Sequence, residues 1–413
     1  MLARIKVEES SEGSRVASEL YLSKSNVDFV IGVERDFQKT LCQAAHFCYA
    51  FCMSFLSHLK KLDWWLVAIV VVIVGMGITS FYDIGPRSPE FIKRQLIFLG
   101  IGIATMLAVS FFDYRILKNL SLASIILYLL ALVLLFFALA SREIRGVSSW
   151  IIFGNFTFEP AEFTKLAILI LLAKYFSQKH VEIYRAHHIL ASAFYVFLPA
   201  IITLLQPDLG SVIVFFCLWL GMLLFAGIKR KHLLVIFMAV VVIATIGWFT
   251  VLKPYQKTRI TAFINPYLDP RGTGYNTLQS KITFGSGRWF GNAFDKKTSQ
   301  RTLVPEPYND FALANFARKF GFVGVLVLLI LFLLLMLRIG SIAVRTDNNF
   351  AKLFSLGLLT IIFAHVIINA GFNLGILPIT GIPFSFLSYG GSHLITLMIG
   401  LGIIQNIRIS TRT

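Results

Sequence analysis

Residues 316–337, FARKFGFVGVLVLLILFLLLML, contain the stretch that decides the fold. No charged side chain occurs between Lys319 and Arg338, so residues 320–337 form one uninterrupted apolar run. A helix rises about 1.5 Å per residue, and a run of roughly 18 to 20 apolar residues crosses the hydrocarbon core of a bilayer. The run therefore predicts a transmembrane helix.

Similar runs recur along the whole chain. Hydrophobic residues make up 57% of its 413 residues and charged residues only 14%, whereas about a quarter of the residues in a soluble domain are charged. We predict an all-α polytopic membrane protein with about ten transmembrane helices. The predicted spans are 64–82, 94–112, 119–140, 161–178, 189–205, 209–227, 231–252, 316–337, 351–373 and 385–407.

Residues 1–60 precede the first span and are predicted to form an N-terminal cytoplasmic tail, followed by a transmembrane domain over 61–413. Residues 1–40 are polar and lack the basic start and apolar run of a signal peptide. Residues 41–59 are predicted to lie in the membrane interface as an amphipathic helix, with an extra span as the alternative. The cysteines of this segment (Cys42, Cys48 and Cys52) fit no strong zinc spacing.

Basic residues cluster in alternate short links between the spans. Lys60 and Lys61 precede the first span, and Arg408 and Arg412 follow the last. The positive-inside rule therefore places both termini in the cytoplasm and the long loop 253–315 outside. This pattern also accounts for the net charge of +17 without nucleic acid as a partner.

Two carboxylates lie at helix starts near the predicted outer side. In FEPAEFTKL, Glu162 and Lys165 are three residues apart and share a helix face. Ionisable groups at membrane depth usually face a bundle interior or a wet cavity; the alternative is an ion pair that reaches water at the interface. In LLQPDLGSV, Asp208 follows a proline and can cap the next helix.

A polar stripe lies on the ninth predicted span. His365, Asn369 and Asn373 are spaced four residues apart in an apolar segment. We predict that they form hydrogen bonds between helices.

The loop 253–315 carries a surplus of cations. Its basic residues are Lys253, Lys257, Arg259, Arg271, Lys281, Arg288, Lys296, Lys297 and Arg301, against Asp269, Asp295, Glu306 and Asp310. This surplus suits an anionic ligand such as a pyrophosphate, or else lipid headgroups. Asp310 is a carboxylate at the end of this basic loop and could act as a general base; the alternative is a helix cap.

Five stretches together resemble one family. They are GVSSWIIFGNFTFEPAEFTKLA, LLQPDLGS, YQKTRITAFINPYLDPRGTGYNTLQSKITFGSG, LVPEPYNDF and LPITGIPFSFLSYGG. In this order and with ten spans, they resemble the SEDS family (shape, elongation, division and sporulation), the RodA/FtsW group of peptidoglycan polymerases. The resemblance covers about residues 62–408 and is slightly closer to RodA.

The resemblance implies a glycosyltransferase of the bacterial cytoplasmic (inner) membrane. Such an enzyme polymerises lipid II, an undecaprenyl-pyrophosphate disaccharide-pentapeptide, at the outer face and works with a class B penicillin-binding protein. It implies that Asp310 is the catalytic base. The residues implied for substrate binding are Trp150, Glu162, Lys165, Asp208, Arg259, Gln279, Lys281 and Glu306. No metal-ligand set is visible in the sequence, and a divalent cation is left open.

The chain departs from the family pattern beside Asp310. Asn309 replaces a threonine, Arg318 and Lys319 replace an acidic pair, and Arg288 replaces a glycine. Extra cations near Asp310 would stabilise its ionised form or hold a leaving pyrophosphate. Two further functions are kept as alternatives: a lipid-linked precursor transporter (flippase), and a non-catalytic scaffold that activates the penicillin-binding protein.

Overall fold

The structure is a computed structural model. It describes residues 53, 55–82, 88–141, 148–154, 156–179, 186–250, 254–268, 273–292, 304 and 306–412. The chain divides into two units, Met1–Leu62 and Asp63–Thr413. In the first unit, residues 53 and 55–61 are helical. The rest of the predicted tail, with its three cysteines, lies outside the described residues. Everything below concerns the second unit.

In the described part of the chain, ten long helices overlap the ten predicted spans. They are α2 (Trp64–Phe81), α3 (Ser88–Phe111), α5 (Ser121–Leu139), α6 (Pro160–Lys179), α7 (Ala186–Leu205), α8 (Leu209–Phe225), α9 (Arg230–Thr250), α13 (Ala312–Arg345), α14 (Asn349–Asn373) and α15 (Gly391–Arg412). Eight are long and apolar enough to cross a membrane. The other two are α6, which carries several charges, and α8, which has 17 residues. The polytopic helical fold is confirmed, and the number of crossings stays a prediction.

The shorter elements lie between these helices. They are α4 (Arg115–Asn119), the strands β1 (Ile151–Phe153) and β2 (Phe156–Phe158), α10 (Pro254–Ile264), the 3-10 turn η1 (Pro266–Leu268) and α11 (Thr273–Ser286). The two strands form one antiparallel hairpin directly before α6. Much of the long loop 253–315 is therefore helical.

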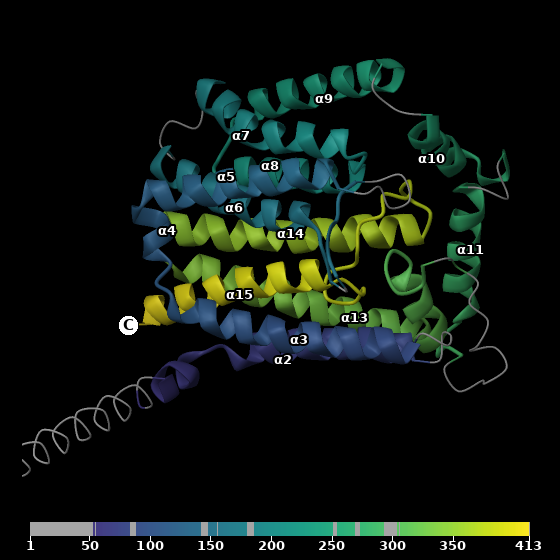
Figure 1. The fold of residues 1–413 in the computed structure, drawn as a ribbon, viewed down its shortest axis with the longest axis horizontal. Coiled ribbons are helices and arrows are strands. Elements are labelled where there is room, and N and C mark those ends of the chain that lie inside the picture. The colour runs from purple at the N-terminus through teal and green to yellow at the C-terminus, as the bar shows by residue number, and fades with distance from the viewer. Residues whose placement is uncertain are drawn as a thin grey trace, which may run out of the picture. The chain divides into compact units, whose positions relative to one another are not determined.

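The long helices lie roughly side by side, and α6 and α14 occupy the middle of the stack (Figure 1). Apolar side chains such as Phe176, Phe354 and Leu401 are completely buried between them. The start of α2 and the end of α15 share one end of the bundle, where the backbone N–H of Asp63 donates to Gln405 over 2.8 Å. At the other end, α11 runs across the helix ends (Figure 1).

Helix α13 begins earlier and ends later than the predicted span 316–337, and it is broken at Gly321, where φ is +67°. The turn after α11 fills the break. The N–H groups of Phe322 and Val323 donate to the carbonyls of Arg288 (2.8 Å) and Trp289 (3.0 Å). Backbone groups freed by a break at membrane depth need such partners. The break therefore fixes the end of α11 against α13.

The predicted start of the last span, residue 385, is wrong. Helix α15 begins at Gly391, and the residues before it form a loop that returns to the start of α13. The N–H of Tyr389 donates to the carbonyl of Tyr308 over 2.8 Å. The Ser388 hydroxyl donates to the carbonyl of Asn309 over 2.7 Å. These loop-to-loop bonds replace the helical bonds that the apolar composition predicts.

Candidate functional site

The ion pair at the start of α6 is the centre of the site. Lys165 Nζ lies 2.7 Å from Glu162 Oε1, and the two side chains are only 3% and 2% exposed. The prediction that both face the bundle interior is confirmed. The alternative, a pair that reaches water at the interface, is wrong.

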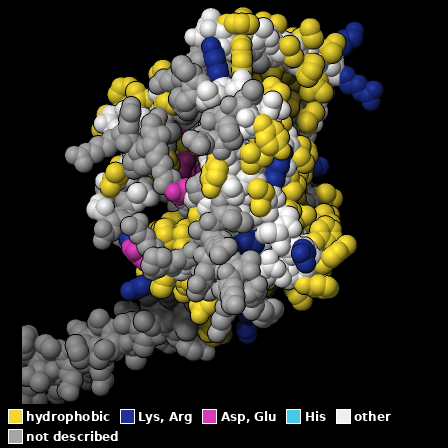
Figure 2. All heavy atoms as spheres, turned by 90° about the vertical axis from the view of Figure 1, so that its right-hand side faces the viewer, with side chains coloured by type: hydrophobic (Ala, Val, Ile, Leu, Met, Phe, Trp, Pro, Cys, Tyr) yellow, Lys and Arg dark blue, Asp and Glu magenta, His cyan; other side chains and the backbone are white. Residues whose placement is uncertain are grey.

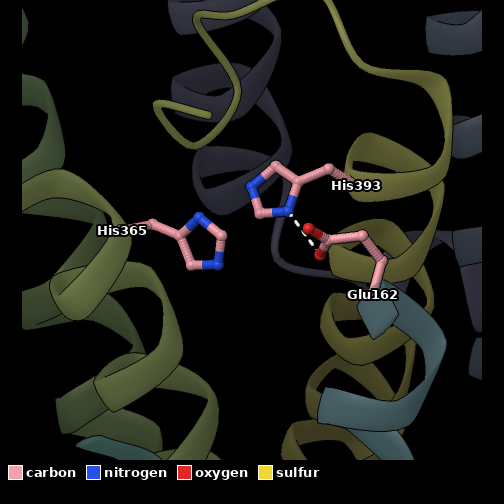
Figure 3. Close-up of side chains that lie close together, drawn as sticks. All are labelled: Glu162, His365 and His393. Atoms are coloured by element: carbon pink, nitrogen blue, oxygen red, sulfur yellow. Dashed lines mark hydrogen bonds and ion pairs between the residues drawn. The ribbon is translucent and has the colours of Figure 1, made fainter. Parts of the chain in front are cut away.

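Two histidines complete a network around this pair; Figure 3 shows them with Glu162. His393 of α15 donates from Nδ1 to Glu162 Oε2 over 2.7 Å. Nδ1 of His365 in α14 lies 3.0 Å from the carbonyl oxygen of Pro383. Because a carbonyl can only accept, Nδ1 carries the proton and donates it. Its Nε2 is then an acceptor for the Lys165 ammonium, 3.0 Å away. Four buried side chains thus join α6, α14 and α15.

The same residues include a set that resembles a metal site. Ligand atoms of Glu162, His365 and His393 all lie within 4.8 Å of one another. They come from three helices, so no spacing in the sequence could have revealed them. However, the Lys165 ammonium already contacts Glu162 and His365. A metal ion would have to displace this positive charge, so the arrangement fits an ion-pair network better than a resident cation.

Glu159 is a site residue that the sequence analysis missed. Burial raises the pKa of its carboxyl to about 8, and the nearby carboxylates Glu162 and Asp208 raise it further, whereas Lys165 and a hydrogen bond with Trp150 lower it. Its backbone N–H donates to the Ser392 hydroxyl over 3.1 Å. The sequence did hold one signal for Glu159, since this carboxylate lies only three residues before Glu162.

Asp208 and Trp150 lie in the same region as Glu162. Asp208 caps α8 by accepting from the N–H of Ser211 over 3.0 Å, so the predicted cap is confirmed. The electrostatic effect of Asp208 on Glu159 and the bond between Trp150 and Glu159 connect both to the α6 start. The structure brings together four of the predicted residues: Trp150, Glu162, Lys165 and Asp208.

The polar stripe on α14 leads from this network to Asp310. Asn369 Nδ2 donates to the carbonyls of Ile382 (2.7 Å) and Asp310 (3.1 Å). Asn373 Nδ2 also donates to the Asp310 carbonyl, over 3.2 Å. The predicted interhelical hydrogen bonds are confirmed for His365, which contacts Lys165 of α6, and for Asn373, whose Oδ1 accepts from the N–H of Ala314 in α13 over 3.2 Å. Asn369 instead binds carbonyls of the loops. His365 lies one turn before Asn369, so one face of α14 contacts both the charged network and the Asp310 backbone.

The alternative role of Asp310 as a helix cap is wrong. The capping position of α13 belongs to Phe311, which has no capping side chain. The Asp310 carboxylate is half-buried and faces the loop before α15, where a Cβ added to Gly381 would lie 3.8 Å from Asp310 Oδ2. The loop is therefore close to the carboxylate, and a Cβ at Gly381 would lie in van der Waals contact with it.

The other predicted binding residues lie toward α10 and α11. Gln279 and Lys281 flank Ser280, whose hydroxyl donates to the carbonyl of Asn373 over 2.9 Å. Glu306 accepts from the Asn309 side chain over 3.2 Å. The side chain of Arg259 lies outside the described residues, although its backbone is part of α10. Helix α11 is thus anchored to the asparagine that also holds Asp310.

Of the two unusual cations of α13, Lys319 contacts the end of α2 directly and Arg318 is connected to it through Asn315. Lys319 donates from Nζ to the carbonyl of Tyr82. Arg318 donates to Asn315 Oδ1 over 3.2 Å, and Asn315 in turn donates to the carbonyl of Ser80 over 2.8 Å. Cations are favourable at a helix C-terminus, where unpaired carbonyls concentrate negative charge. This contact gives the basic pair a structural role between α2 and α13.

Figure 2 looks onto the end of the bundle that carries α10 and α11, and shows acidic side chains set back in a hollow. With the buried network behind this end, the fold and the site define a multi-pass helical membrane protein with a charged site inside the bundle near one end.

Residues 54–413 match the family model of the FtsW/RodA/SpoVE cell cycle proteins. The chain belongs to this family. It is 34% identical over 364 residues to a protein from Tolumonas auensis named probable peptidoglycan glycosyltransferase FtsW, covering 84% of this chain and 92% of the relative. It is 30% identical over 348 residues to the peptidoglycan glycosyltransferase MrdB of Escherichia coli, covering 84% and 93%.

Solved structures show the same fold. A chain from a structure titled as the coordination of polymerization and crosslinking by a peptidoglycan synthase complex has a TM-score of 0.74 and 30% identity, covering 85% of this chain and 98% of that chain. The rod shape determining protein RodA of Thermus thermophilus has a TM-score of 0.64 and 28% identity, covering 85% and 98%. The expected resemblance is confirmed over the transmembrane part of the chain.

Proposed function

We propose that this protein is a peptidoglycan glycosyltransferase that polymerises lipid II into glycan strands at the outer face of the bacterial cytoplasmic membrane. The names of its relatives support the reaction class. The observation that carries the proposal is the placement of Asp310, whose backbone is held by Asn369 and Asn373 beside the buried network.

In this proposal Asp310 is the general base. Its carboxylate accepts the proton of the sugar 4-hydroxyl on the acceptor, and that oxygen attacks the anomeric carbon of the donor. The bond from this carbon to the undecaprenyl pyrophosphate breaks, and the pyrophosphate leaves with the electron pair. Lys281 of α11, with Arg259 of α10, would bind the leaving group, because cations stabilise developing negative charge.

The network of Glu162, Lys165, His365 and His393 has a supporting role in this reaction. It joins α6, α14 and α15, and α14 carries both His365 and the asparagines that hold Asp310. A rigid frame of this kind keeps a base within hydrogen-bonding distance of its proton. Trp150 and Asp208 would line the substrate path next to it.

The hollow at the α11 end and the predicted charge asymmetry of the links support an outward-facing site and cytoplasmic termini. A class B penicillin-binding protein is the proposed partner, and the likeness to a chain of a peptidoglycan synthase complex supports it.

Incubation of the purified protein and its partner with labelled lipid II tests the function. Strands on a gel are expected. If no strands form although the partner binds, the scaffold function would replace the proposed one. If labelled lipid II instead crosses the bilayer of sealed vesicles without polymerising, the transporter function would be correct.

A further inference from the structure

A basic pocket lies at the end of the bundle opposite α11 and has no role in the proposed reaction. Its volume is about 160 Å³, and side chains of α13 and α15 line it. The lining residues are Arg338, Ser341, Ile342, Arg345, Arg408 and Thr411. Three guanidinium groups thus converge on one small space.

The carboxylate of Asp63 holds two of these arginines in place. Arg338 Nε lies 2.6 Å from Asp63 Oδ2, and Arg408 Nε lies 3.4 Å from the same atom. Asp63 itself is only 1% exposed. Among the described residues that line the pocket or pair with its arginines, three positive charges stand against this single negative one, which leaves a surplus of two positive charges. Its chemistry is that of a site for an anion.

The two hydroxyl groups that line the pocket already donate their protons to backbone carbonyls, so the arginines would supply the hydrogen bonds to an anion. Ser341 Oγ donates to the carbonyl of Arg338, and Thr411 Oγ1 donates to the carbonyl of Ile407, each over 2.8 Å. A guanidinium presents paired N–H groups that match the oxygens of a phosphate. A phosphate group is therefore the anion that this lining fits best.

The depth of the pocket indicates where such a phosphate comes from. Arg338 is the first charged residue after the apolar run 320–337, so it marks the end of the hydrocarbon region. Directly before Arg338, Leu337 of α13 is 59% exposed, as expected for a side chain that faces lipid at this boundary. We propose that this pocket binds the phosphate of an anionic phospholipid in the leaflet at this end of the bundle.

A binding titration with the full-length protein tests this site. Fluorescent phosphatidylglycerol is the probe, in detergent, and Arg345→Gln is the variant, since Arg345 is exposed and forms no ion pair with any residue in the described part of the chain. Loss of one charge-assisted contact should weaken probe binding about tenfold. Arg115→Gln removes an exposed arginine near the same end that does not line the pocket, and should bind as the parent does.

Two competitors identify the source of the phosphate. Unlabelled phosphatidylglycerol should displace the probe, whereas inorganic phosphate should not. Displacement by inorganic phosphate would make the pocket a site for a soluble anion and overturn the lipid assignment. If Arg345→Gln and Arg115→Gln weakened probe binding equally, the effect would come from general surface charge, and the lipid assignment would also be overturned.

Discussion

At the scale of single residues, the ion pair of Glu162 and Lys165 is buried, and its disruption should strongly destabilise the protein. Removal of one partner leaves the other charge buried without compensation, which costs about 3–5 kcal/mol. We therefore expect Glu162→Gln to lower the unfolding midpoint strongly. The double variant Glu162→Gln/Lys165→Met should lose less than the sum of the two single variants, with a coupling of about 0.5–3 kcal/mol.

The pair of Glu90 and Arg94 is the matched control. Its atoms lie 2.6 Å apart, but its side chains are 58% and 42% exposed. Exposed pairs four apart on a helix contribute only about 0.3–0.5 kcal/mol. If Glu90→Gln destabilised the protein as much as Glu162→Gln, burial would not be the reason for the cost.

The raised pKa of Glu159 predicts how the free energy of unfolding depends on pH. Its ordinary pKa is 4.5, and in the fold it is raised to about 8. Between these values the folded chain keeps a proton that the unfolded chain has released, so this group makes stability fall as pH rises through the window. Glu159→Gln should flatten this part of the curve of unfolding midpoint against pH, whereas Glu90→Gln should keep the slope of the parent. If the curve of Glu159→Gln had the same slope as that of the parent, the carboxyl of Glu159 would ionise at its ordinary pKa.

At the scale of elements, the contact of α11 with α13 depends on Gly287. A Cβ at this position would meet the backbone carbonyl of Ala317, whereas a Cβ at Gly285 would meet open space. A backbone carbonyl cannot move aside, so Gly287→Ala should destabilise the protein by about 1–3 kcal/mol.

Gly285→Ala is the control, because Gly285 lies inside α11 and alanine favours helix by up to about 1 kcal/mol. Unfolding midpoints of the two variants measure the difference. Equal midpoints would mean that α11 does not pack on α13 as described.

The sequence predicts the helices well and their connections poorly. Apolar length alone predicted all ten long helices, because a span in lipid has few other solutions. It missed the break at Gly321 and the late start of α15 at Gly391. Both depend on hydrogen bonds between segments distant in the sequence, such as that of Phe322 with Arg288, and no local pattern reports such bonds.

The same limit applies to the site. Glu162 and Lys165 could be found because they share one helix face, and the stripe of α14 because of its regular spacing. His393 gave no signal, since it reaches Glu162 from another helix, α15. Glu159 could be suspected from its place three residues before Glu162, but its closeness to Asp208 is known only from the fold.

At the scale of the whole molecule, the bundle separates two charged regions. One end holds Asp63 with Arg338 and Arg408, and the region toward the other end holds the Glu162 network and Asp310. The central claim is that the second region carries out glycosyl transfer with Asp310 as its base.

Polymerisation of labelled lipid II by Asp310→Asn, with the partner protein present, tests this claim most directly. Asparagine keeps the shape of the side chain but cannot accept the proton, so strand synthesis should fall by about 10²- to 10⁴-fold with an unchanged unfolding midpoint. Asp113→Asn, an exposed aspartate before α4, should polymerise at the parent rate. Full activity in Asp310→Asn would contradict the account.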